Sequence, residues 1–195
     1  MIANFAATTL DDVQLTSLDD NTPLGRFMAR EYGPCRDELL RKFPWPFARR
    51  RAALTPVATA PDFEYTYAYN LPANCLRLLP VTKDGLKNGL KIAYDLEGRQ
   101  ILTNEGPGIK IRYIEQVQSP AAFDPLFSRA LGQYLAMLAA QRVTGKASYH
   151  EKAKALYFAA LQEAYHVASL EGGPAEPVYL EEFPTESEFL SVRGI

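Results

Sequence analysis

The chain has 195 residues, of which 47% are hydrophobic and 23% are charged, and its formal net charge at pH 7 is −2. These values are typical of one globular unit with appendages, and the near-neutral charge supplies no global attraction to nucleic acid or to an anionic membrane. No apolar run approaches the roughly 18 residues that a membrane span requires, and no basic start leads into an apolar signal region. We therefore expect neither signal-directed export nor insertion into a membrane.

A helix is predicted from Leu24 to about Phe43, after an N-terminal arm over residues 1–23 in which residues 10–15 could form a short helix. Its apolar side chains recur at helical spacing and would form one buried face: Phe27, Met28, Tyr32, Cys35, Leu39, Leu40 and Phe43. Pro34 falls inside this stretch and predicts a kink or a fresh helix start. Pro44 and Pro46 end the helix and bracket Trp45, the only tryptophan, which we expect to pack against apolar side chains.

Three consecutive arginines, Arg49, Arg50 and Arg51, follow this turn. Residues 52–60 then lose periodicity and contain a proline, so we expect them to cross the molecule without regular structure. Salt bridges at a subunit interface are the favoured use of the arginines, and the acidic C-terminal tail offers a complementary surface, within a subunit or between neighbours. Contact with DNA is the weaker alternative, because no recognition helix or stacking platform accompanies the cluster.

A small antiparallel β domain is predicted over residues 61–118. Its clearest strand has alternating apolar residues and therefore an aromatic face: Phe63, Tyr65, Tyr67, Tyr69 and Leu71. We expect a second extended piece over residues 75–81, a hairpin over residues 90–103 that turns at Glu97 and Gly98, and a final strand over residues 109–113. The aromatic strand would serve as core or subunit interface, and Tyr65 and Tyr67 are its candidate interface residues.

Two further helices are predicted after the β domain. Asp124 and Pro125 are typical of an N-cap and first helical residue, and Gly145 would end that helix. Ser148 and Glu151 form a capping box for a second helix that runs to about Leu170. The short loop between them implies an antiparallel helix hairpin. Alanines on the first of these helices would let a neighbour pack closely: Ala130, Ala136, Ala139 and Ala140.

The C-terminal segment is acidic. Residues 171–195 contain six Glu and one Arg, a net charge of −5 that leaves residues 1–170 at +3. Residues 173–195 also hold prolines and isolated apolar residues, so we expect an extended tail that does not fold alone and that binds another subunit or a partner. The candidate docking residues in this tail are Tyr179, Leu180, Phe183, Phe189 and Leu190.

The sequence carries few residues suited to catalysis. Cys35 and Cys75 form no CxxC pair and lie among apolar neighbours, and His150 and His166 stand sixteen residues apart on one predicted helix. There is no GxGxxG, GxxxxGK[ST], HExxH or GxSxG motif. We therefore predict no catalytic residue, no metal site and no cofactor. A cysteine-dependent hydrolase remains a minor alternative.

Four stretches of this sequence resemble one family. They are RDELLRKFPWPFARRRAAL, YAYNLPANCLRLL, YDLEGRQILTN and FDPLFSRALGQYLAMLAAQRVTG, within residues 17–170. Together they resemble the tail tubular protein A family, the head-to-tail adaptors of short-tailed bacteriophages. The resemblance is sharpest in the helix that runs into Pro44-Trp45-Pro46-Phe47 and in the aromatic strand that ends at Leu71-Pro72.

The resemblance implies an α+β protein that is not an enzyme. Its helical domain, residues 24–60 and 119–172, would form a ring of twelve subunits beneath the portal protein, and its β domain would face the distal tail. Such a ring continues the channel through which genomic DNA passes without sequence-specific binding, and it offers a platform to the next tail or nozzle protein. The expected location is the virion, after synthesis in the bacterial cytoplasm. Alternatives are another phage neck or tail-completion protein, and a DNA-binding regulator.

Overall fold

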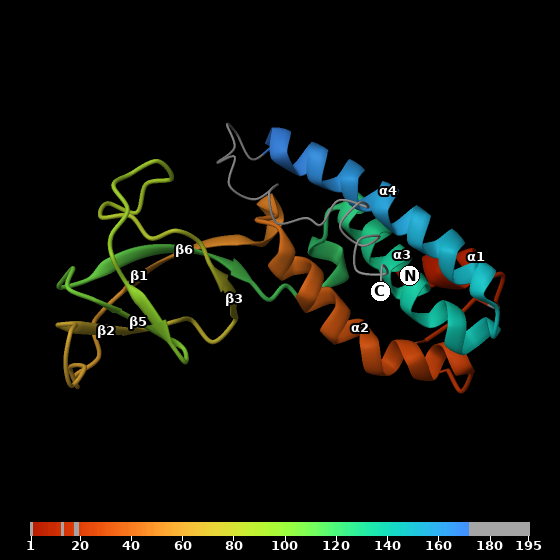
Figure 1. The fold of residues 1–195 in the computed structure, drawn as a ribbon, viewed down its shortest axis with the longest axis horizontal. Helices are drawn as coiled ribbons and strands as arrows, with labels where there is room; N and C mark the ends of the chain where they lie inside the picture. Colours follow the sequence, from red (N-terminus) through yellow and green to blue (C-terminus); the bar gives the residue numbers. More distant parts are fainter. Residues whose placement is uncertain (1, 13, 18–19, 172–195) are drawn as a thin grey trace, which may run out of the picture.

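The protein has an α+β fold in which a β region is inserted between the second and third of four α-helices (Figure 1). The computed structural model describes residues 2–12, 14–17 and 20–171. The helices form a body at one end of the elongated molecule and the strands form the other end. Each part has its own apolar core, and Ile114 and Leu79 belong to the core of the helical body although they lie within or beside the strands. The expected α+β class is therefore confirmed.

The helical body comprises α1 (Ala3–Thr9), α2 (Pro23–Lys42), α3 (Pro125–Thr144) and α4 (Ala147–Glu171). The side chain of Asp124 accepts hydrogen bonds from the amides of Leu126 and Phe127 at 2.8 and 3.1 Å, as expected of an N-cap. Gly145 has φ 67° and ends α3 in the left-handed region that favours glycine. The helix hairpin of α3 and α4 is present as predicted (Figure 1).

At the C-terminal end of α2, side chains instead of backbone amides donate hydrogen bonds to the last carbonyls of the helix. Proline has no N–H, so Pro44 and Pro46 cannot bond the last carbonyls of the helix. Instead the Trp45 indole N–H donates to the Leu39 carbonyl at 2.9 Å, and Arg77 donates to the carbonyls of Arg41 and Lys42 at 2.8 and 3.1 Å. A guanidinium also suits the negative end of a helix dipole. Pro34 lies inside α2, which is one continuous helix that changes direction along its length (Figure 1). Of the two alternatives predicted at Pro34, a kink and a fresh helix start, the kink is therefore correct.

The β region contains two antiparallel sheets of three strands. The first has the order β1-β6-β3, with β1 at Arg49–Leu54, β6 at Ile109–Glu115 and β3 at Cys75–Leu78. The second has the order β2-β5-β4, with β2 at Tyr67–Asn70, β5 at Gln100–Thr103 and β4 at Asp95–Glu97. The predicted turn at Glu97 and Gly98 and the final strand are confirmed.

The structure corrects the expectation for the arginine run. Residues 49–54 form strand β1, whereas we expected irregular chain after the arginines. The strand forms because β6 pairs with all six of its residues, a tertiary contact that local periodicity does not reveal. The regular sheet therefore begins before residue 61.

The aromatic strand is shorter than predicted. Regular pairing begins only at Tyr67, because Glu64 has φ 68° and the preceding residues form a bend. Phe63 is 80% exposed, and residues 90–94 of the predicted hairpin make only a single bridge, between Lys91 and Thr82.

The N-terminal helix lies at Ala3–Thr9, not around residues 10–15. Its small side chains pack against α3, where a Cβ added at Gly132 would lie 2.5 Å from the Cβ of Phe5. The alanines of α3 that we expected to let a neighbour pack closely are fully buried in the subunit's own core: Ala130, Ala136, Ala139 and Ala140.

Candidate functional site

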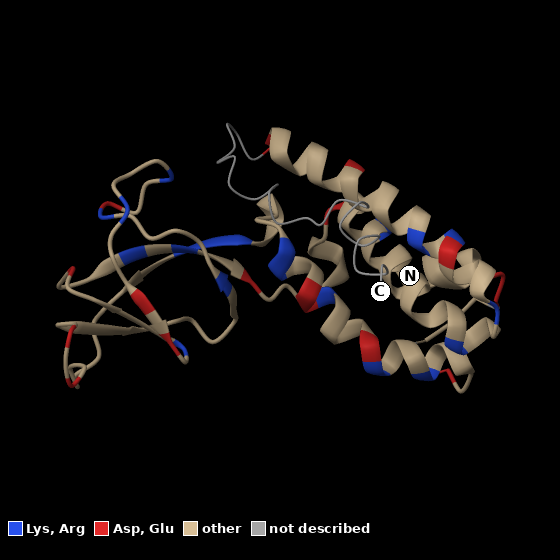
Figure 2. Ribbon diagram, viewed as in Figure 1, with Lys and Arg blue, Asp and Glu red and all other residues tan. Residues whose placement is uncertain are grey.

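The arginine run lies on β1 beside β6, and basic residues adjoin on the two neighbouring strands (Figure 2). Side chains alternate along a strand, so Ala52 and Leu54 point into the β core while Arg49 and Arg51 point to the opposite face. On β6 the residues paired with Arg51 and Ala53 are Arg112 and Lys110. We define the cationic face as these four residues: Arg49, Arg51, Lys110 and Arg112.

Like charges crowd this face. Burial, followed by repulsion from Arg112 and Arg51, lowers the pKa of the Arg49 guanidinium. Arg50 points to the other side of the strand and pairs with Glu115 at 2.7 Å. Within the part of the chain that the structure describes, no carboxylate forms an ion pair with Arg49, Arg51, Lys110 or Arg112. The face therefore has a positive potential that the described residues do not neutralise.

The loop over residues 82–91 flanks the distal end of the cationic face. Arg112 donates a hydrogen bond to the Lys87 carbonyl at 3.2 Å, which holds one guanidinium against the loop. A Cβ added at Gly85 would lie 2.6 Å from the Cβ of Lys110, so the loop backbone approaches β6 closely. This packing orients Arg112 and leaves the Lys110 and Arg51 side chains exposed to solvent.

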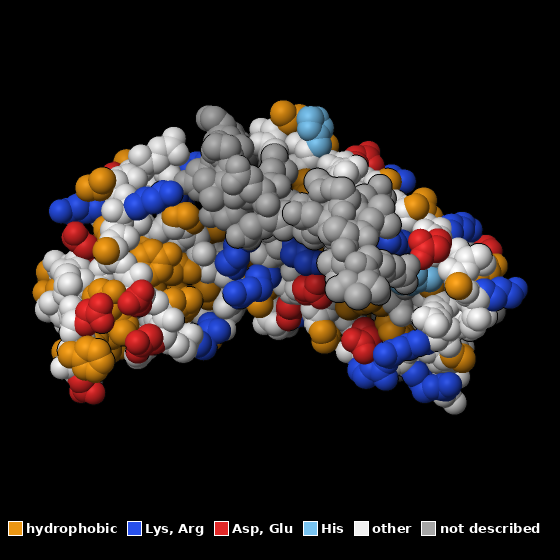
Figure 3. Space-filling model, in the orientation of Figure 1, with side chains coloured by type: hydrophobic (Ala, Val, Ile, Leu, Met, Phe, Trp, Pro, Cys, Tyr) orange, Lys and Arg blue, Asp and Glu red, His pale blue; other side chains and the backbone are white. Residues whose placement is uncertain are grey.

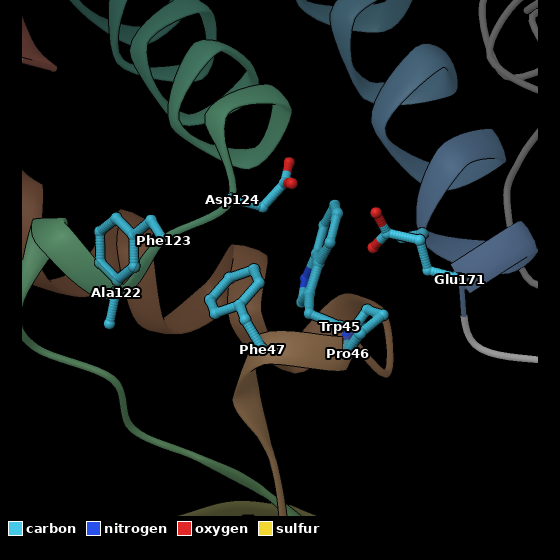
Figure 4. A pocket seen from close by; sticks show the side chains of 8 residues that line it. Trp45, Pro46, Phe47, Ala122, Phe123, Asp124 and Glu171 are labelled. Atoms are coloured by element: carbon cyan, nitrogen blue, oxygen red, sulfur yellow. The ribbon is translucent and has the colours of Figure 1, made fainter.

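The other end of the face adjoins the elbow that connects α2 to β1. Trp45 is 1% exposed, and its ring lies 5.0 Å from that of Phe127 and 5.3 Å from that of Tyr165. The elbow borders a cavity of about 190 Å³ between the start of α3 and the end of α4 (Figure 4). Glu171, the last residue of α4, lines this cavity together with Pro46. Pro46 precedes the first residue of β1 by three positions.

The structure separates the two groups of predicted interface residues. Arg49 and Arg51 lie on the cationic face, whereas Tyr67 begins β2 of the second sheet and Tyr65 precedes that strand. The Tyr65 hydroxyl donates to Asp95 at 2.7 Å, and this hydrogen bond raises the pKa of Tyr65 to about 12. Tyr67 packs against Tyr69 in the β core, so it is partly used within the subunit.

The predicted docking residues of the tail lie outside the described residues: Tyr179, Leu180, Phe183, Phe189 and Leu190.

Exposed apolar side chains occur on both the β region and the helical body. On the β region they include Phe63, Leu86 and Leu90, which are 80%, 62% and 76% exposed. Figure 3 shows hydrophobic side chains gathered on this end of the molecule. On the helical body, α4 exposes Leu156, Phe158 and Leu170. Leucine and phenylalanine on an outer surface are typical of contacts with other proteins when several occur together.

The cysteines are poorly placed for nucleophilic chemistry. Both are buried, and burial raises the pKa of Cys35 to about 12 and raises that of Cys75. A protonated thiol is a weak nucleophile, which weakens the hydrolase alternative. The His150 Nδ1 lies 3.1 Å from the Met137 carbonyl across the helix hairpin. The described ranges contain no group of three or more His, Cys, Asp or Glu that could hold a metal ion.

The sequence interpretation missed Lys110 and Arg112 as members of the basic cluster. Both alternate with the buried residues Ile109, Ile111 and Tyr113, so their exposure could have been predicted from the strand pattern. Their position opposite Ala53 and Arg51 could not, because register depends on the partner strand.

No protein-family model matches the chain. No curated protein matches it either. None of the described helices has the length and hydrophobicity needed to span a membrane.

Proposed function

We propose that this protein is a head-to-tail adaptor of a bacteriophage virion, a non-enzymatic subunit of a homo-oligomeric ring of about twelve copies that docks beneath the portal protein. The ring would continue the DNA channel and offer a platform to the downstream tail or nozzle protein. Its subunits would reside at the head-tail junction after synthesis in the host cytoplasm.

The observation that carries this proposal is the arrangement of the segments that resemble the adaptor family. The Pro44-Trp45-Pro46-Phe47 turn is the junction between the helical body and the β region, and its tryptophan is among the most buried residues of the molecule. The aromatic strand and the predicted hairpin then lie together in the sheet β2-β5-β4, and the last resembling stretch forms α3. The resembling stretches thus contribute to both apolar cores instead of being scattered surface segments.

The surface supports an assembly role. An adaptor needs separate contact areas for the portal, for neighbouring subunits and for the distal tail. The exposed apolar residues of α4 belong to the helical body, whereas those of the loops near Leu86 and Phe63 belong to the β region (Figure 1). The mixed surface charge suits a channel wall, because a uniformly basic lumen would retain DNA phosphates.

Electron microscopy of the purified protein, alone and mixed with the portal protein from the same genome, tests this function. An additional ring on the portal is the expected result. A folded protein that stays monomeric and adds no density to the portal would contradict it, and would favour a different neck or tail-completion component.

Two further experiments address the alternatives and the docking segment. Deletion of residues 175–195, which contain the candidate docking residues, should weaken portal binding while the helical content stays unchanged. A DNA-binding regulator would instead bind duplex DNA with an affinity that falls steeply as salt rises. The adaptor should form no sequence-specific complex with duplex DNA.

A further inference from the structure

No carboxylate among the described residues pairs with the cationic face, and the same chain contains a segment of opposite charge. Between residues 176 and 188 the sequence has five glutamates and no lysine or arginine: Glu176, Glu181, Glu182, Glu186 and Glu188. The cationic face has four positive side chains on two neighbouring strands, with Arg51 directly opposite Arg112. The numbers and signs of the charges are therefore complementary.

The last described residue before this segment lies near the end of the face. Helix α4 ends at Glu171, which lies in the elbow cavity with Pro46 and Phe47 (Figure 4). Strand β1 begins at Arg49, directly after this elbow. The five residues from Glu171 to Glu176 can span up to about 17 Å when extended. Strand β1 is about 20 Å long. Residues 176–188 can therefore reach the full length of the face without leaving their own subunit.

We propose that the acidic segment 176–188 docks on the cationic face of the same chain. The carboxylates of the segment pair with the guanidinium groups of Arg49, Arg51 and Arg112 and with the ammonium group of Lys110. The contact relieves the repulsion between the cross-strand arginines and occupies a face that would otherwise attract DNA phosphates. It does not depend on the proposed function. In an adaptor it would also hold the tail against its own subunit until a partner binds the apolar residues of the tail.

Zero-length cross-linking with a water-soluble carbodiimide tests this contact, because the reagent joins a carboxylate to an amine only where the two already pair. The full-length protein should yield a cross-link between Lys110 and a glutamate of the acidic segment, identified by mass spectrometry of the monomer band. The Lys42–Glu38 pair, whose Nζ and Oε1 atoms lie 2.8 Å apart, provides an internal positive control. A Lys42–Glu38 link without any link from Lys110 to the segment would overturn the proposal.

Charge variants separate docking from chance proximity. The double variant R51E/R112E removes the attraction and keeps Lys110 as the amine, so its cross-link yield should fall at least about fivefold. The matched variant R142E/K152E changes the net charge equally on the exposed loop end of the helix hairpin and should leave the yield unchanged. Wild-type protein in 1 M NaCl, where the Debye length is about 3 Å, should reproduce the loss without any substitution. A yield that resists both changes would contradict the proposal.

Two other occupants would give different results. In a mixture of isotopically light and heavy protein, cross-linked peptides that combine both isotopes would assign the face to the tail of a second copy. Protection of Lys110 from acetylation by short duplex DNA, with no cross-link to the segment, would assign the face to nucleic acid. Either result overturns docking within one chain, and neither depends on whether the protein binds a portal.

Discussion

Replacing Trp45 with alanine should strongly destabilise the protein. The side chain is 1% exposed and contacts the rings of Phe43, Phe127 and Tyr165. Truncation of a buried tryptophan to alanine costs about 3–5 kcal/mol of unfolding free energy, because it leaves a cavity that neighbours fill only partly. The variant also loses the hydrogen bond from the indole to the Leu39 carbonyl, one of the last acceptors of α2. For a chain of this size the melting temperature should fall by about 6–20 °C.

Urea unfolding followed by circular dichroism at 222 nm measures this loss without relying on tryptophan fluorescence. The variant W45F separates the two contributions, since it keeps an aromatic ring and removes only the N–H donor and part of the volume. Its cost should be about 1–3 kcal/mol, the typical penalty for leaving a buried acceptor unpaired. The matched control is F63A, which truncates an aromatic ring that is 80% exposed and should change stability by less than about 0.5 kcal/mol. A W45A variant less than about 1 kcal/mol weaker than wild type would refute the assignment of the elbow as the structural junction.

Three further predictions concern packing, thiol reactivity and pH. G132A should lose about 1–3 kcal/mol in the same urea assay because its Cβ would lie 2.5 Å from that of Phe5, and unchanged stability would contradict this packing. At pH 8 native Cys35, whose pKa is raised to about 12, should react with iodoacetamide about a thousandfold more slowly than in urea, and rapid native labelling would contradict the burial. Burial raises the pKa of Tyr157, so its stabilising contribution is present below pH 10 and is lost above it. Above pH 10 the free energy of unfolding of Y157F should fall less steeply with pH than that of the wild type, by up to about 1.4 kcal/mol per pH unit. An unchanged slope would contradict the burial of the Tyr157 hydroxyl.

The elements predicted correctly from the sequence are those with local signals. Asp124 and Gly145 bracket α3 because their side-chain and backbone preferences act within a few residues. The elements predicted wrongly depend on distant partners. Strand β1 has an arginine-rich sequence that favours no strand by itself, and it forms because β6 lies beside it. Helix α1 has no side-chain cap and is stabilised by packing of its alanines on α3.

The candidate site, too, could be predicted from the sequence only in part. The arginine run is visible in the sequence, but the cationic face also includes Arg112 and Lys110, which lie about sixty residues further along the chain. Strand register alone places Arg112 opposite Arg51, and no feature of either segment specifies that pairing. The sequence thus revealed the charge, and only the fold revealed that the charge forms one face.

The cross-strand arginine pair is itself an argument for a binding role. Like charges directly opposite each other on a sheet are destabilising, and Arg49 adds a third guanidinium to the same face. The stability of the sheet comes from the buried residues on its other face, among them Ile109, Ile111 and Tyr113, and does not require these charges. A local arrangement that opposes folding without a compensating contact is typical of a functional site. An anionic partner would convert the repulsion into attraction, and the acidic segment of the chain meets that requirement within the reach of its own covalent connection.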